Sequence, residues 1–512
     1  MERPVDLLVV GGGINGAGIA RDAAGRGLSV VLCEKGDLAG ATSSASSKLI
    51  HGGLRYLEHL EFRLVREALQ EREVLLHAAP HIIRPLRFVL PHAKGLRPAW
   101  MLRAGLVLYD RLGGRERLPP SAAIDLRRDP LGAPLKASFT RGFSYADCWV
   151  DDARLVVLTA VDARDRGADV RTRTRCIGAR RTDGLWEAEL ESAGGSRTRL
   201  RARGLVNAAG PWVDQVLGQI SGTTRKSGLR LVKGSHIVVP RLHDGDQAYI
   251  LQNRDRRVFF VLPYENRFSL IGTTEEPYEG ELGTVQISDS ETAYLCDAAN
   301  RYFTRGVSPG DVVWSYAGVR PLYDDARVNA SAITRGYVFD LDSGDGQPPL
   351  LSVFGGKITT FRKLAEHALD KLAPHLPNAG PAWTQTAALP GGDMPDADFG
   401  RFLNEFTAAR SWLPGALARR FARAYGTRAE DLLGSAQSLN DLGRHLGDDL
   451  YEAEADYLCR EEWARSTEDI LWRRSKLGLH VSAATRRHLA DWIGARNAPF
   501  TAQADSGEPV GE

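Results

Sequence analysis

The chain has 512 residues, more than one compact core usually contains, so two or three domains are expected. Its 43% hydrophobic and 25% charged residues are ordinary for a soluble globular protein, and a net charge of +2 excludes the strong basic excess of most nucleic-acid binders. The cysteines form no CxxC or Cys/His cluster, which favours reduced thiols and no metal site; they are Cys33, Cys148, Cys176, Cys296 and Cys459.

Neither a signal peptide nor a transmembrane helix is expected. The first apolar run, at residues 5–10, is short and ends in glycines, and no run of about 18 apolar residues occurs later. Any contact with a membrane is therefore expected to be peripheral, and the predicted location is cytoplasmic.

The first expected element is a strand at residues 5–10, VDLLVV, whose apolar residues suit a parallel sheet that is buried on both faces. The segment GGGING at 11–16 follows it and opens a helix of small residues. A second buried strand, SVVLCE at 29–34, ends in an acidic residue. Together these segments predict a βαβ unit.

This unit has the glycine spacing of a dinucleotide-binding site. Gly11 permits the tight turn, Gly13 lets the backbone approach a pyrophosphate, and Gly16 lets the helix pack closely on the strand. The helix N-terminus offers N–H groups to phosphates, and Glu34 lies where a carboxylate binds ribose hydroxyls, which argues against NADP. The alternative is a purely structural glycine turn, and the fingerprint alone does not choose between FAD and NAD.

Two later segments are expected to be strands of the same sheet. They are GLVNAAGPW at 204–212 and LLSVFGGKITTFRKLAEHAL at 350–369, the second being a strand, a glycine turn and a helix. These segments, with a fingerprint at the N-terminus, favour FAD. The FAD-binding domain is then discontinuous and comprises residues 1–79, 150–233 and 318–375.

The inserted segments are typical of a second, antiparallel sheet. They are GSHIVVP at 234–240, AYILQN at 248–253, RVFFVLPYENRFSLIGTT at 257–274, in which PYENR suits a hairpin connection, and DVVWSYAGVRP at 311–321. With material from the first third of the chain, they predict a substrate-binding β domain of residues 80–149 and 234–317.

The C-terminal part is expected to differ from the rest. Proline and glycine density at 376–398 indicates a linker, helical patterns over 399–500 predict a separate α-helical domain, and residues 501–512 are expected to be disordered.

Several long motifs resemble one family. They are GGGINGAGIARDAAGRGLSV, ATSSASSKLIHGGLRYLE, FRLVREALQEREVLL, DCWVDDARLV, GLVNAAGPWV, KGSHIVVPR, IGTTE, GVRPL and LLSVFGGKITTFRKLAEHAL. Together they are similar to the aerobic, FAD-dependent glycerol-3-phosphate dehydrogenases of bacteria, from about residue 4 to about residue 485. The sequence departs from the family at Gly40, where a larger residue or cysteine is expected, and at Glu275, where many members have Asp.

The resemblance implies a D-amino-acid-oxidase type of fold: a Rossmann-like FAD domain, a β substrate domain and a helical C-terminal domain. It implies one non-covalent FAD per chain and oxidation of glycerol 3-phosphate to dihydroxyacetone phosphate, with electrons passed to membrane quinone. Peripheral contact with the inner membrane, a homodimer and no nucleic-acid partner are the other expectations.

The fingerprint and the resemblance together give a set of expected FAD-binding residues. They are Gly11, Gly13, Ile14, Asn15, Gly16, Glu34, Thr42, Ser43, Ser46, Ser47, Lys48, Leu49, His51, Cys176, Ala209, Gly210, Trp212, Gly318, Gly355, Gly356, Lys357, Ile358 and Thr359. Among them, Lys48 is expected to bring a cation near the flavin ring or its phosphates.

The loop SSKLIHGGLRYL at 46–57 has the groups that oxidation of a phosphorylated alcohol requires. Arg55 is expected to hold the phosphate or the C2 oxygen, His51 to accept the hydroxyl proton, and Tyr56 to bind substrate. Gly52 and Gly53 are expected to let the chain pass close to the flavin. The alternatives are a structural histidine, a surface salt bridge and a packed tyrosine.

Two further basic residues are expected in the site. Arg320 follows an apolar strand, which is unusual for an arginine unless a pocket lies there, and it either binds substrate or polarises the C2 hydroxyl. Lys357 lies at a helix N-terminus, where a cation opposes the helix dipole, so a role beside the reduced flavin is expected. Thr273 is a weaker substrate-binding candidate.

Residues 95–118 contain Trp100, several leucines and five arginines, a pattern typical of a basic amphipathic helix on an anionic bilayer. The alternatives are an ordinary packed helix, or membrane contact through arginines of the C-terminal domain.

Three other functions stay open at this stage. A hydrogen-peroxide-producing oxidase on the same substrate differs mainly in oxygen access to the flavin. An amine or amino-acid oxidase of the same fold has less need of Arg55, Arg320 and Lys357. A flavin-binding module without catalysis has no use for these residues.

Overall fold

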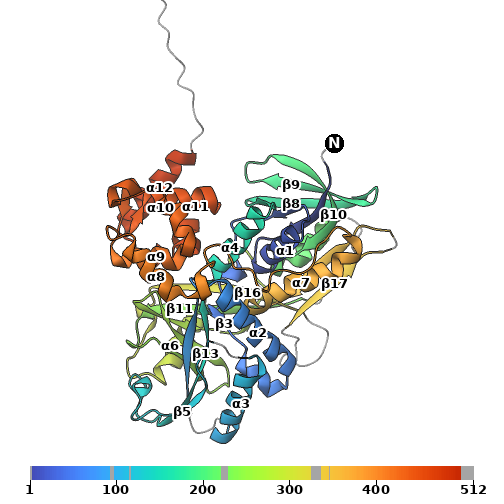
Figure 1. The fold of residues 1–512 in the computed structure, drawn as a ribbon. Helices are drawn as coiled ribbons and strands as arrows, with labels where there is room; N and C mark the ends of the chain where they lie inside the picture. The colour runs from blue at the N-terminus through green and yellow to red at the C-terminus, as the bar shows by residue number, and fades with distance from the viewer. Residues whose placement is uncertain are drawn as a thin grey trace, which may run out of the picture. The chain divides into compact units, whose positions relative to one another are not determined.

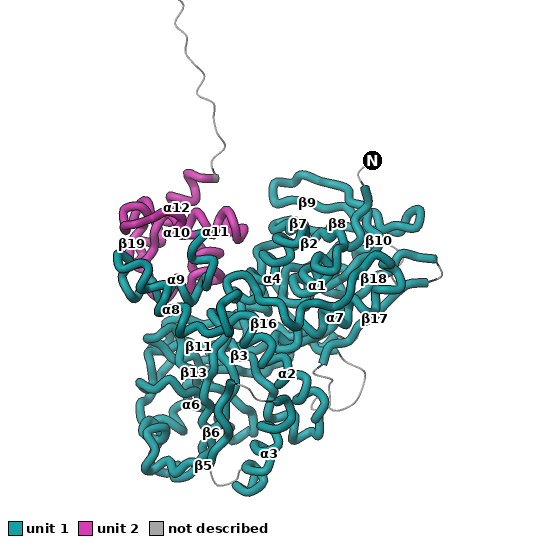
Figure 2. Tube along the Cα trace, in the orientation of Figure 1, with its two compact units in different colours: residues 1–431 teal, residues 432–512 magenta. Residues whose placement is uncertain are grey.

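The computed structural model describes residues 3–92, 97–114, 117–220, 229–323, 336–344 and 346–497. The chain divides into two compact units, residues 1–431 and 432–512 (Figure 2). The expected tail at 501–512 lies outside the described residues. Within the described part of the chain, no helix has both the length and the apolar character needed to span a bilayer.

The first unit contains a mainly parallel sheet that begins with the predicted βαβ unit (Figure 1). Its strand order is β17-β18-β10-β1-β2-β7, in which only β17 runs antiparallel to its neighbour. The strands are β1 (Val5–Val10), β2 (Val30–Cys33), β7 (Asp169–Arg171), β10 (Arg197–Asn207), β17 (Tyr337–Asp342) and β18 (Leu350–Gly355). This discontinuous sheet has strands from both ends of the unit.

Strand β10 forms both antiparallel and parallel pairs with its neighbours. Its first half pairs antiparallel with β9 (Leu185–Ser192), which in turn pairs with β8 (Thr174–Thr182). Its second half runs parallel to β1 on one side and to β18 on the other. Because β1, β10 and β18 run in the same direction, their carboxyl ends lie at one edge of the sheet.

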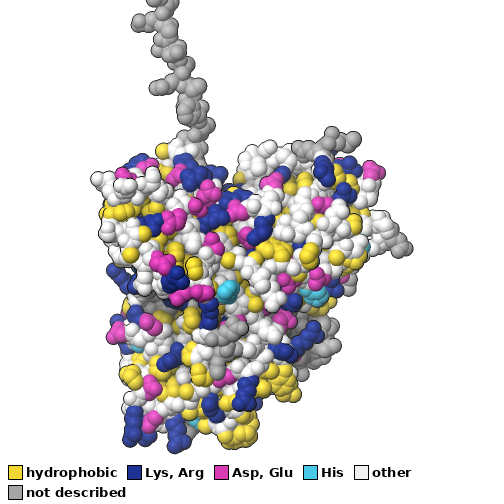
Figure 3. Space-filling model, in the orientation of Figure 1, with side chains coloured by type: hydrophobic (Ala, Val, Ile, Leu, Met, Phe, Trp, Pro, Cys, Tyr) yellow, Lys and Arg dark blue, Asp and Glu magenta, His cyan; other side chains and the backbone are white. Residues whose placement is uncertain are grey.

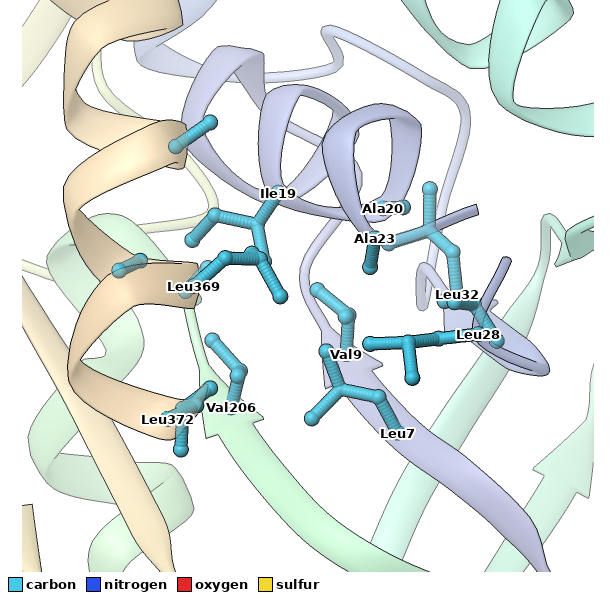
Figure 4. Packing of buried hydrophobic residues seen from close by; sticks show 14 of the residues in the cluster. Leu7, Val9, Ile19, Ala20, Ala23, Leu28, Leu32, Val206, Leu369 and Leu372 are labelled. Carbon is cyan, nitrogen blue, oxygen red and sulfur yellow. The ribbon is translucent and has the colours of Figure 1, made fainter. Parts of the chain in front are cut away.

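Helices α1 (Ile14–Gly25) and α7 (Phe361–Leu372) cover one face of this sheet. Figure 4 shows Ile19 of α1 and Leu369 of α7 pointing toward Val9 and Val206 of the sheet. Small residues along α1 permit this close approach. A third helix near this sheet, α4 (Asp152–Asp165), packs beside α1. Its N-cap residue, Asp151, accepts a hydrogen bond from the Arg154 amide.

The second sheet has the order β15-β11-β14-β13-β12-β4-β6-β3, with β16 beside β11 and β5 beside β6. All of its pairs are antiparallel except β12 with β4. The strands are β3 (Leu49–Ile50), β4 (Ile83–Pro91), β5 (Ala122–Asp125), β6 (Arg141–Val150), β11 (Leu229–Pro240), β12 (Ala248–Gln252), β13 (Val258–Tyr264), β14 (Phe268–Gly272), β15 (Glu276–Pro277) and β16 (Trp314–Tyr323). The expected hairpin falls between β13 and β14. Three helices accompany this sheet: α2 (Phe62–Ala78), α3 (Ala99–Leu112) and α6 (Asp289–Asn300).

Two expected domain boundaries fall inside strands. The boundary after residue 233 falls inside β11, and the boundary after residue 317 falls inside β16. The two strands pair with each other along almost their whole length. If this unit is divided into an FAD domain and a substrate domain, β11 and β16 each contribute residues to both.

The proline-rich segment at 376–398 packs against the sheet helices. The Trp383 ring lies between two guanidinium groups, with the Cζ atoms of Arg21 and Arg166 at 4.8 and 3.8 Å from its centroid. The Gly380 amide donates to the Arg26 carbonyl at 2.8 Å. The helices α8 (Phe399–Ala408) and α9 (Gly415–Tyr425) follow within the first unit, so the second unit begins 33 residues later than residue 399.

The second unit is mainly helical. It contains α11 (Glu452–Glu461), a π-helical segment (Asp469–Arg474) and α12 (Ala483–Asn497), with one small hairpin of β19 (His445–Gly447) and β20 (Leu450–Tyr451). The last helix of the first unit, α10 (Ala429–Leu433), crosses the boundary. A discontinuous parallel sheet, a mainly antiparallel sheet and C-terminal helices together confirm the predicted fold class.

Candidate active site

A cavity of about 570 Å³ opens in the first unit where the two sheets meet. Most of the expected site residues line it: Ile14, Thr42, Ser43, Ser46, Ser47, Leu49, His51, Arg55, Tyr56, Thr273, Gly318, Arg320, Gly355, Gly356, Lys357, Ile358 and Thr359. These residues come from segments more than 300 positions apart. Their convergence makes this cavity the candidate active site.

The glycine fingerprint forms a tight turn at the end of β1. Gly11 has φ +115°, and a Cβ on Gly16 would lie 1.9 Å from the Gly11 carbonyl oxygen, so neither position accepts a side chain. A Cβ on Gly13 would meet only the Ser43 hydroxyl, at 3.1 Å. The α1 N-terminus has no side-chain cap and no acidic residue in its first turn. This turn therefore fits a pyrophosphate.

Glu34 lies at the expected ribose position. Its carboxylate accepts hydrogen bonds from the amides of Gly12 and Gly36, both at 2.7 Å. Burial raises the pKa of Glu34, and the two amide bonds oppose that change. The bonds fix the orientation of the carboxylate while lone pairs remain for ribose hydroxyls.

The NAAG segment lies beside this turn. Ala208 donates its amide to the Val10 carbonyl at 2.9 Å, and a Cβ on Gly11 would lie 3.0 Å from the Ala209 Cα. Gly210 and Trp212 follow in a 3₁₀ turn, and the Lys35 ammonium lies 3.7 Å from a Trp212 ring centroid. These residues are near the fingerprint, although they do not line the cavity.

Asn15 joins the fingerprint to the glycine turn after β18. Its Nδ2 donates to the Gly355 carbonyl at 3.1 Å, and Gly356 has φ +96°. Its buried Oδ1 accepts no hydrogen bond from any described group. An unsatisfied acceptor beside the fingerprint fits a site that receives a hydrogen-bond donor from a bound cofactor.

Two expected FAD-binding side chains have other partners. The fully buried Lys48 ammonium bonds both Asp152 carboxylate oxygens at 2.9 and 3.0 Å, so its charge already has a partner within the protein. Asp152 is 104 residues away in sequence, and nothing near Lys48 indicates the pair. The Cys176 thiol is buried in the apolar cluster that covers the other face of the first sheet, and its Sγ lies 3.6 Å from the Gly178 carbonyl oxygen.

The hydroxyl groups of this region also bond to the protein. Thr42 donates to the Val319 carbonyl at 2.7 Å, Ser46 donates to Asp152 at 2.8 Å, and Ser47 lies 2.9 Å from His236 Nε2. Ser43 accepts from the Ile14 amide at 3.0 Å. These hydrogen bonds hold the loop in place at the cavity wall.

The loop that carries His51 is held from two sides. The His51 amide donates to Thr359 Oγ1 at 3.2 Å, and the Gly52 amide donates to Tyr109 Oη at 2.8 Å. A Cβ on Gly52 would lie 2.4 Å from the Leu69 side chain. Gly53 has φ +75°, and a Cβ there would meet the Tyr56 ring at 2.3 Å. Contacts within the protein therefore require glycine at both positions, and the expected close approach to flavin stays a prediction.

The His51 imidazole is neutral at physiological pH. Burial, together with the positive charges of Lys357 and Arg72, lowers its pKa to about 4. A neutral imidazole in a cavity can accept a proton from a substrate hydroxyl.

The cations of the cavity differ in their partners. Arg55 makes no ion pair or hydrogen bond with any described residue. Lys357 Nζ lies 3.8 Å from the Tyr56 ring centroid. Arg320 lies 3.4 Å from Glu275 Oε1 and 3.4 Å from Thr273 Oγ1, contacts that are long enough to yield to a ligand.

Sequence reasoning missed several cavity residues. Arg230 and Arg257 add two cations, and Glu276 joins Glu275 as a second carboxylate. Five cationic side chains therefore oppose two carboxylates among the described lining residues. The direction of each side chain depends on strand register in the second sheet, which local patterns do not give. Thr273 lines the cavity, whereas the next residue, Thr274, is buried outside it and donates a hydrogen bond to Glu291 at 2.6 Å.

Comparison with known families decides the affiliation. A profile described as "FAD dependent oxidoreductase" matches residues 6–362, and one described as "C-terminal domain of alpha-glycerophosphate oxidase" matches residues 382–494. The chain belongs to the FAD-dependent oxidoreductase family. FAD is its cofactor, and the fingerprint turn, Glu34 and the cavity are the parts that would hold it.

Similar members of the FAD-dependent oxidoreductase family cover almost the whole chain. A glycerol-3-phosphate dehydrogenase of Pseudomonas aeruginosa is 58% identical, over 95% of this chain and 94% of its own length. A D-erythritol 1-phosphate dehydrogenase of Brucella abortus is 54% identical, over 96% and 98%. The aerobic glycerol-3-phosphate dehydrogenase of Escherichia coli is 53% identical, over 95% and 97%. These relatives confirm the resemblance seen in the motifs.

A solved structure of the same family supports the fold. The glycerol-3-phosphate dehydrogenase of Bacillus halodurans, complexed with FAD, is 27% identical, with a TM-score of 0.77. The match covers 97% of this chain and 91% of that one.

Proposed function

We propose that the protein oxidises glycerol 3-phosphate to dihydroxyacetone phosphate and passes the electrons to a membrane quinone. The observation that carries the proposal is Arg55: an arginine in the cavity, close in sequence to the neutral His51, that no described side chain neutralises. A partly exposed guanidinium in a cavity, without a carboxylate partner among the described residues, is suited to an anionic ligand.

The charges of the cavity favour a phosphorylated substrate. Arg55, Arg320 and Lys357 line one cavity, and the planar guanidinium groups can each donate two parallel hydrogen bonds to phosphate oxygens. Arg320 also lies 3.4 Å from Glu275 at the cavity wall. A free amino acid has a single carboxylate and would need only one such clamp.

The remaining groups suit oxidation of a secondary alcohol. His51 accepts the hydroxyl proton, and Arg55 or Arg320 holds the C2 oxygen as it becomes a carbonyl. Bound FAD supplies the acceptor for the hydride that leaves C2. Lys357 keeps a positive charge in the cavity where negative charge develops, with the Tyr56 ring face beside it.

A membrane acceptor is supported by an exposed apolar patch, which we call the α3 patch. It consists of Leu60, Phe62, Trp100, Met101 and Leu108, and in Leu60 and Trp100 more than two thirds of the surface is exposed. Figure 3 shows hydrophobic side chains beside Lys and Arg at the end of the molecule that carries α3 in Figure 1.

The basic residues near the α3 patch suit anionic lipid headgroups. Arg111 is exposed, and Arg97 is half exposed with a 3.3 Å contact to Glu58. Arg103 instead donates to the Ser121 hydroxyl and carbonyl, at 2.9 and 3.0 Å, so it contributes less to this surface. Arg115 lies outside the described residues.

An anaerobic titration tests the proposal. Glycerol 3-phosphate added to the FAD-loaded protein should bleach a band near roughly 450 nm, and glycerol and amino acids should not. D-erythritol 1-phosphate is added in parallel, and faster bleaching by it would reassign the substrate. Rapid re-oxidation by a soluble quinone and slow re-oxidation by air is the expected result; the reverse would identify an oxidase.

A further inference from the structure

In the loop at residues 46–57, two consecutive backbone amides donate hydrogen bonds to hydroxyl groups from distant parts of the chain. The His51 amide donates to Thr359 Oγ1 at 3.2 Å, and the Gly52 amide donates to Tyr109 Oη at 2.8 Å. Thr359 belongs to the 3₁₀ turn Ile358–Thr360, and Tyr109 belongs to α3. Neither hydroxyl is part of the loop itself, so both fix its position from outside.

Tyr109 is in turn fixed by a buried carboxylate. Its hydroxyl lies 2.8 Å from both oxygens of Asp147 on β6, and Arg72 Nη1 lies 2.8 Å from Asp147 Oδ1. The side chains of Arg72 and Asp147 are 4% and 2% exposed. Burial beside Asp147 raises the pKa of Tyr109, so its hydroxyl keeps its proton and donates to the carboxylate. The tyrosine oxygen therefore presents its lone pair to the Gly52 amide at 2.8 Å, and Asp147 Oδ1 is a second, more distant acceptor of the same amide at 3.4 Å.

Gly52 packs closely against its neighbours on this side of the loop. A Cβ on Gly52 would lie 2.4 Å from Leu69 and 2.7 Å from Tyr109 Oη. The Tyr109 ring itself is 2% exposed and packs edge-on against Tyr145, with centroids 5.9 Å apart. The buried, hydrogen-bonded Tyr109 is therefore a fixed support for the Gly52 amide.

We propose that Tyr109 and Thr359 are positioning residues that act on catalysis through His51. The inference rests on the proposed role of His51 as the proton acceptor. Rates of proton transfer are sensitive to small displacements of the base, and a misplacement of about 1 Å can cost about 10²-fold. Neither residue needs to touch the reacting atoms for this effect.

The test uses full-length, FAD-loaded protein and the rate constant of anaerobic flavin reduction at saturating glycerol 3-phosphate. Tyr109→Phe removes the hydroxyl and keeps the ring. We expect a rate constant about 10 to 100-fold lower, with substrate affinity changed less than about threefold. In a His51→Gln background the same substitution should change the rate less than about threefold, because both changes act on one step.

Tyr249→Phe is the matched control. Tyr249 is fully buried, and its hydroxyl also accepts one hydrogen bond, from Gln247 at 2.8 Å, and donates one, to the Leu131 carbonyl at 2.7 Å. It belongs to the core of the second sheet and does not line the cavity. This variant should lose similar thermal stability and keep its rate within about twofold. An equal loss of rate in both variants, or in both His51 backgrounds, would overturn the inference.

Two further measurements keep the inference testable. If Tyr109→Phe does not fold, Thr359→Val is compared with Thr359→Ser, which keeps the hydroxyl; equal rates would overturn the role of Thr359 and with it the inference. If glycerol 3-phosphate does not bleach the wild-type protein, the proposed function fails, and amide hydrogen exchange of residues 51–54 still decides. Faster exchange in Tyr109→Phe than in Tyr249→Phe supports the positioning role, and unchanged exchange contradicts it.

Discussion

The ammonium of Lys357 lies 3.8 Å from the centroid of the Tyr56 ring, inside a cavity that also contains Arg55 and Arg320. The two residues are 301 positions apart, one in the loop after β3 and the other in the turn after β18. Their contact links the two segments that enclose the candidate active site. The ring face stabilises the cation without neutralising it, because a quadrupole attracts a charge but does not cancel it.

Lys357→Met should make the bound FAD harder to reduce. Removal of a positive charge near the reduced cofactor is expected to lower its midpoint potential by about 30 to 60 mV, or about 1.4 to 2.8 kcal/mol for a two-electron couple. Dye-coupled reductive titration measures the potential. Lys363→Met is the control, since Lys363 is half exposed beside Glu366 and does not line the cavity. A potential equal to that of the wild type would place Lys357 away from the flavin.

The rate of flavin reduction should stay constant on the acidic side until low pH. Burial lowers the pKa of His51 to about 4, so the imidazole remains neutral well below the usual histidine range. At saturating substrate, the acidic limb of the rate constant for flavin reduction is therefore expected near pH 4 to 5. A limb near pH 6.5 would mean that His51 is solvated or is not the base.

The same pKa has a consequence for stability. Between pH 6.5 and pH 4 the unfolded chain binds a proton at His51 that the folded protein does not, so the free energy of unfolding falls as pH is lowered. His51→Gln should reduce this dependence. Urea unfolding of both proteins at pH 7 and pH 5 measures it, and identical pH dependence would contradict the assignment.

Arg55→Ala should weaken use of the phosphorylated substrate. Loss of a charged hydrogen bond costs about 1.5 to 3 kcal/mol, which corresponds to a roughly 10 to 150-fold lower kcat/KM. Arg87→Ala, at an exposed position of β4, is the control. Steady-state assays with glycerol 3-phosphate and a quinone analogue provide the values. A change within twofold would show that the phosphate binds elsewhere.

The α3 patch should govern vesicle binding. The double variant Trp100→Ser and Leu108→Ser removes exposed apolar surface and is expected to lower co-sedimentation with anionic vesicles at least tenfold. Val313→Ser is the control, because Val313 is half exposed and is not part of the α3 patch. Equal sedimentation of both variants would exclude the patch as the membrane contact.

Short-range patterns in the sequence were sufficient for the first part of the fold. The spacing of Gly11, Gly13, Gly16 and Glu34 predicts the βαβ unit, and the structure places β1 at the predicted residues. The residues His51, Arg55, Tyr56, Arg320 and Lys357 were also expected in one site, and they line one cavity. Their site roles stay predictions.

Other features depend on contacts that no local pattern contains. Lys48 looked like a cofactor ligand because it is a cation in the right loop, but its partner Asp152 begins a helix far along the chain. Arg230 faces the cavity because of the register between β11 and β16. The contact of Tyr109 with Gly52 requires α3 and β6 to meet behind the loop, which only the folded chain shows.

The double role of β10 has a consequence for synthesis of the chain. Strand β1 is complete at Val10, but its central partner begins at Arg197, and the strand on the far side of β10 begins at Leu350. At about 5 to 20 residues per second, β1 has an unpaired edge for about 10 to 40 s after it is made, and β10 waits for a similar time. An apolar strand with an open edge readily joins another chain. We therefore expect nascent chains to be prone to association while these edges are open, and fragments that end before residue 350 to aggregate.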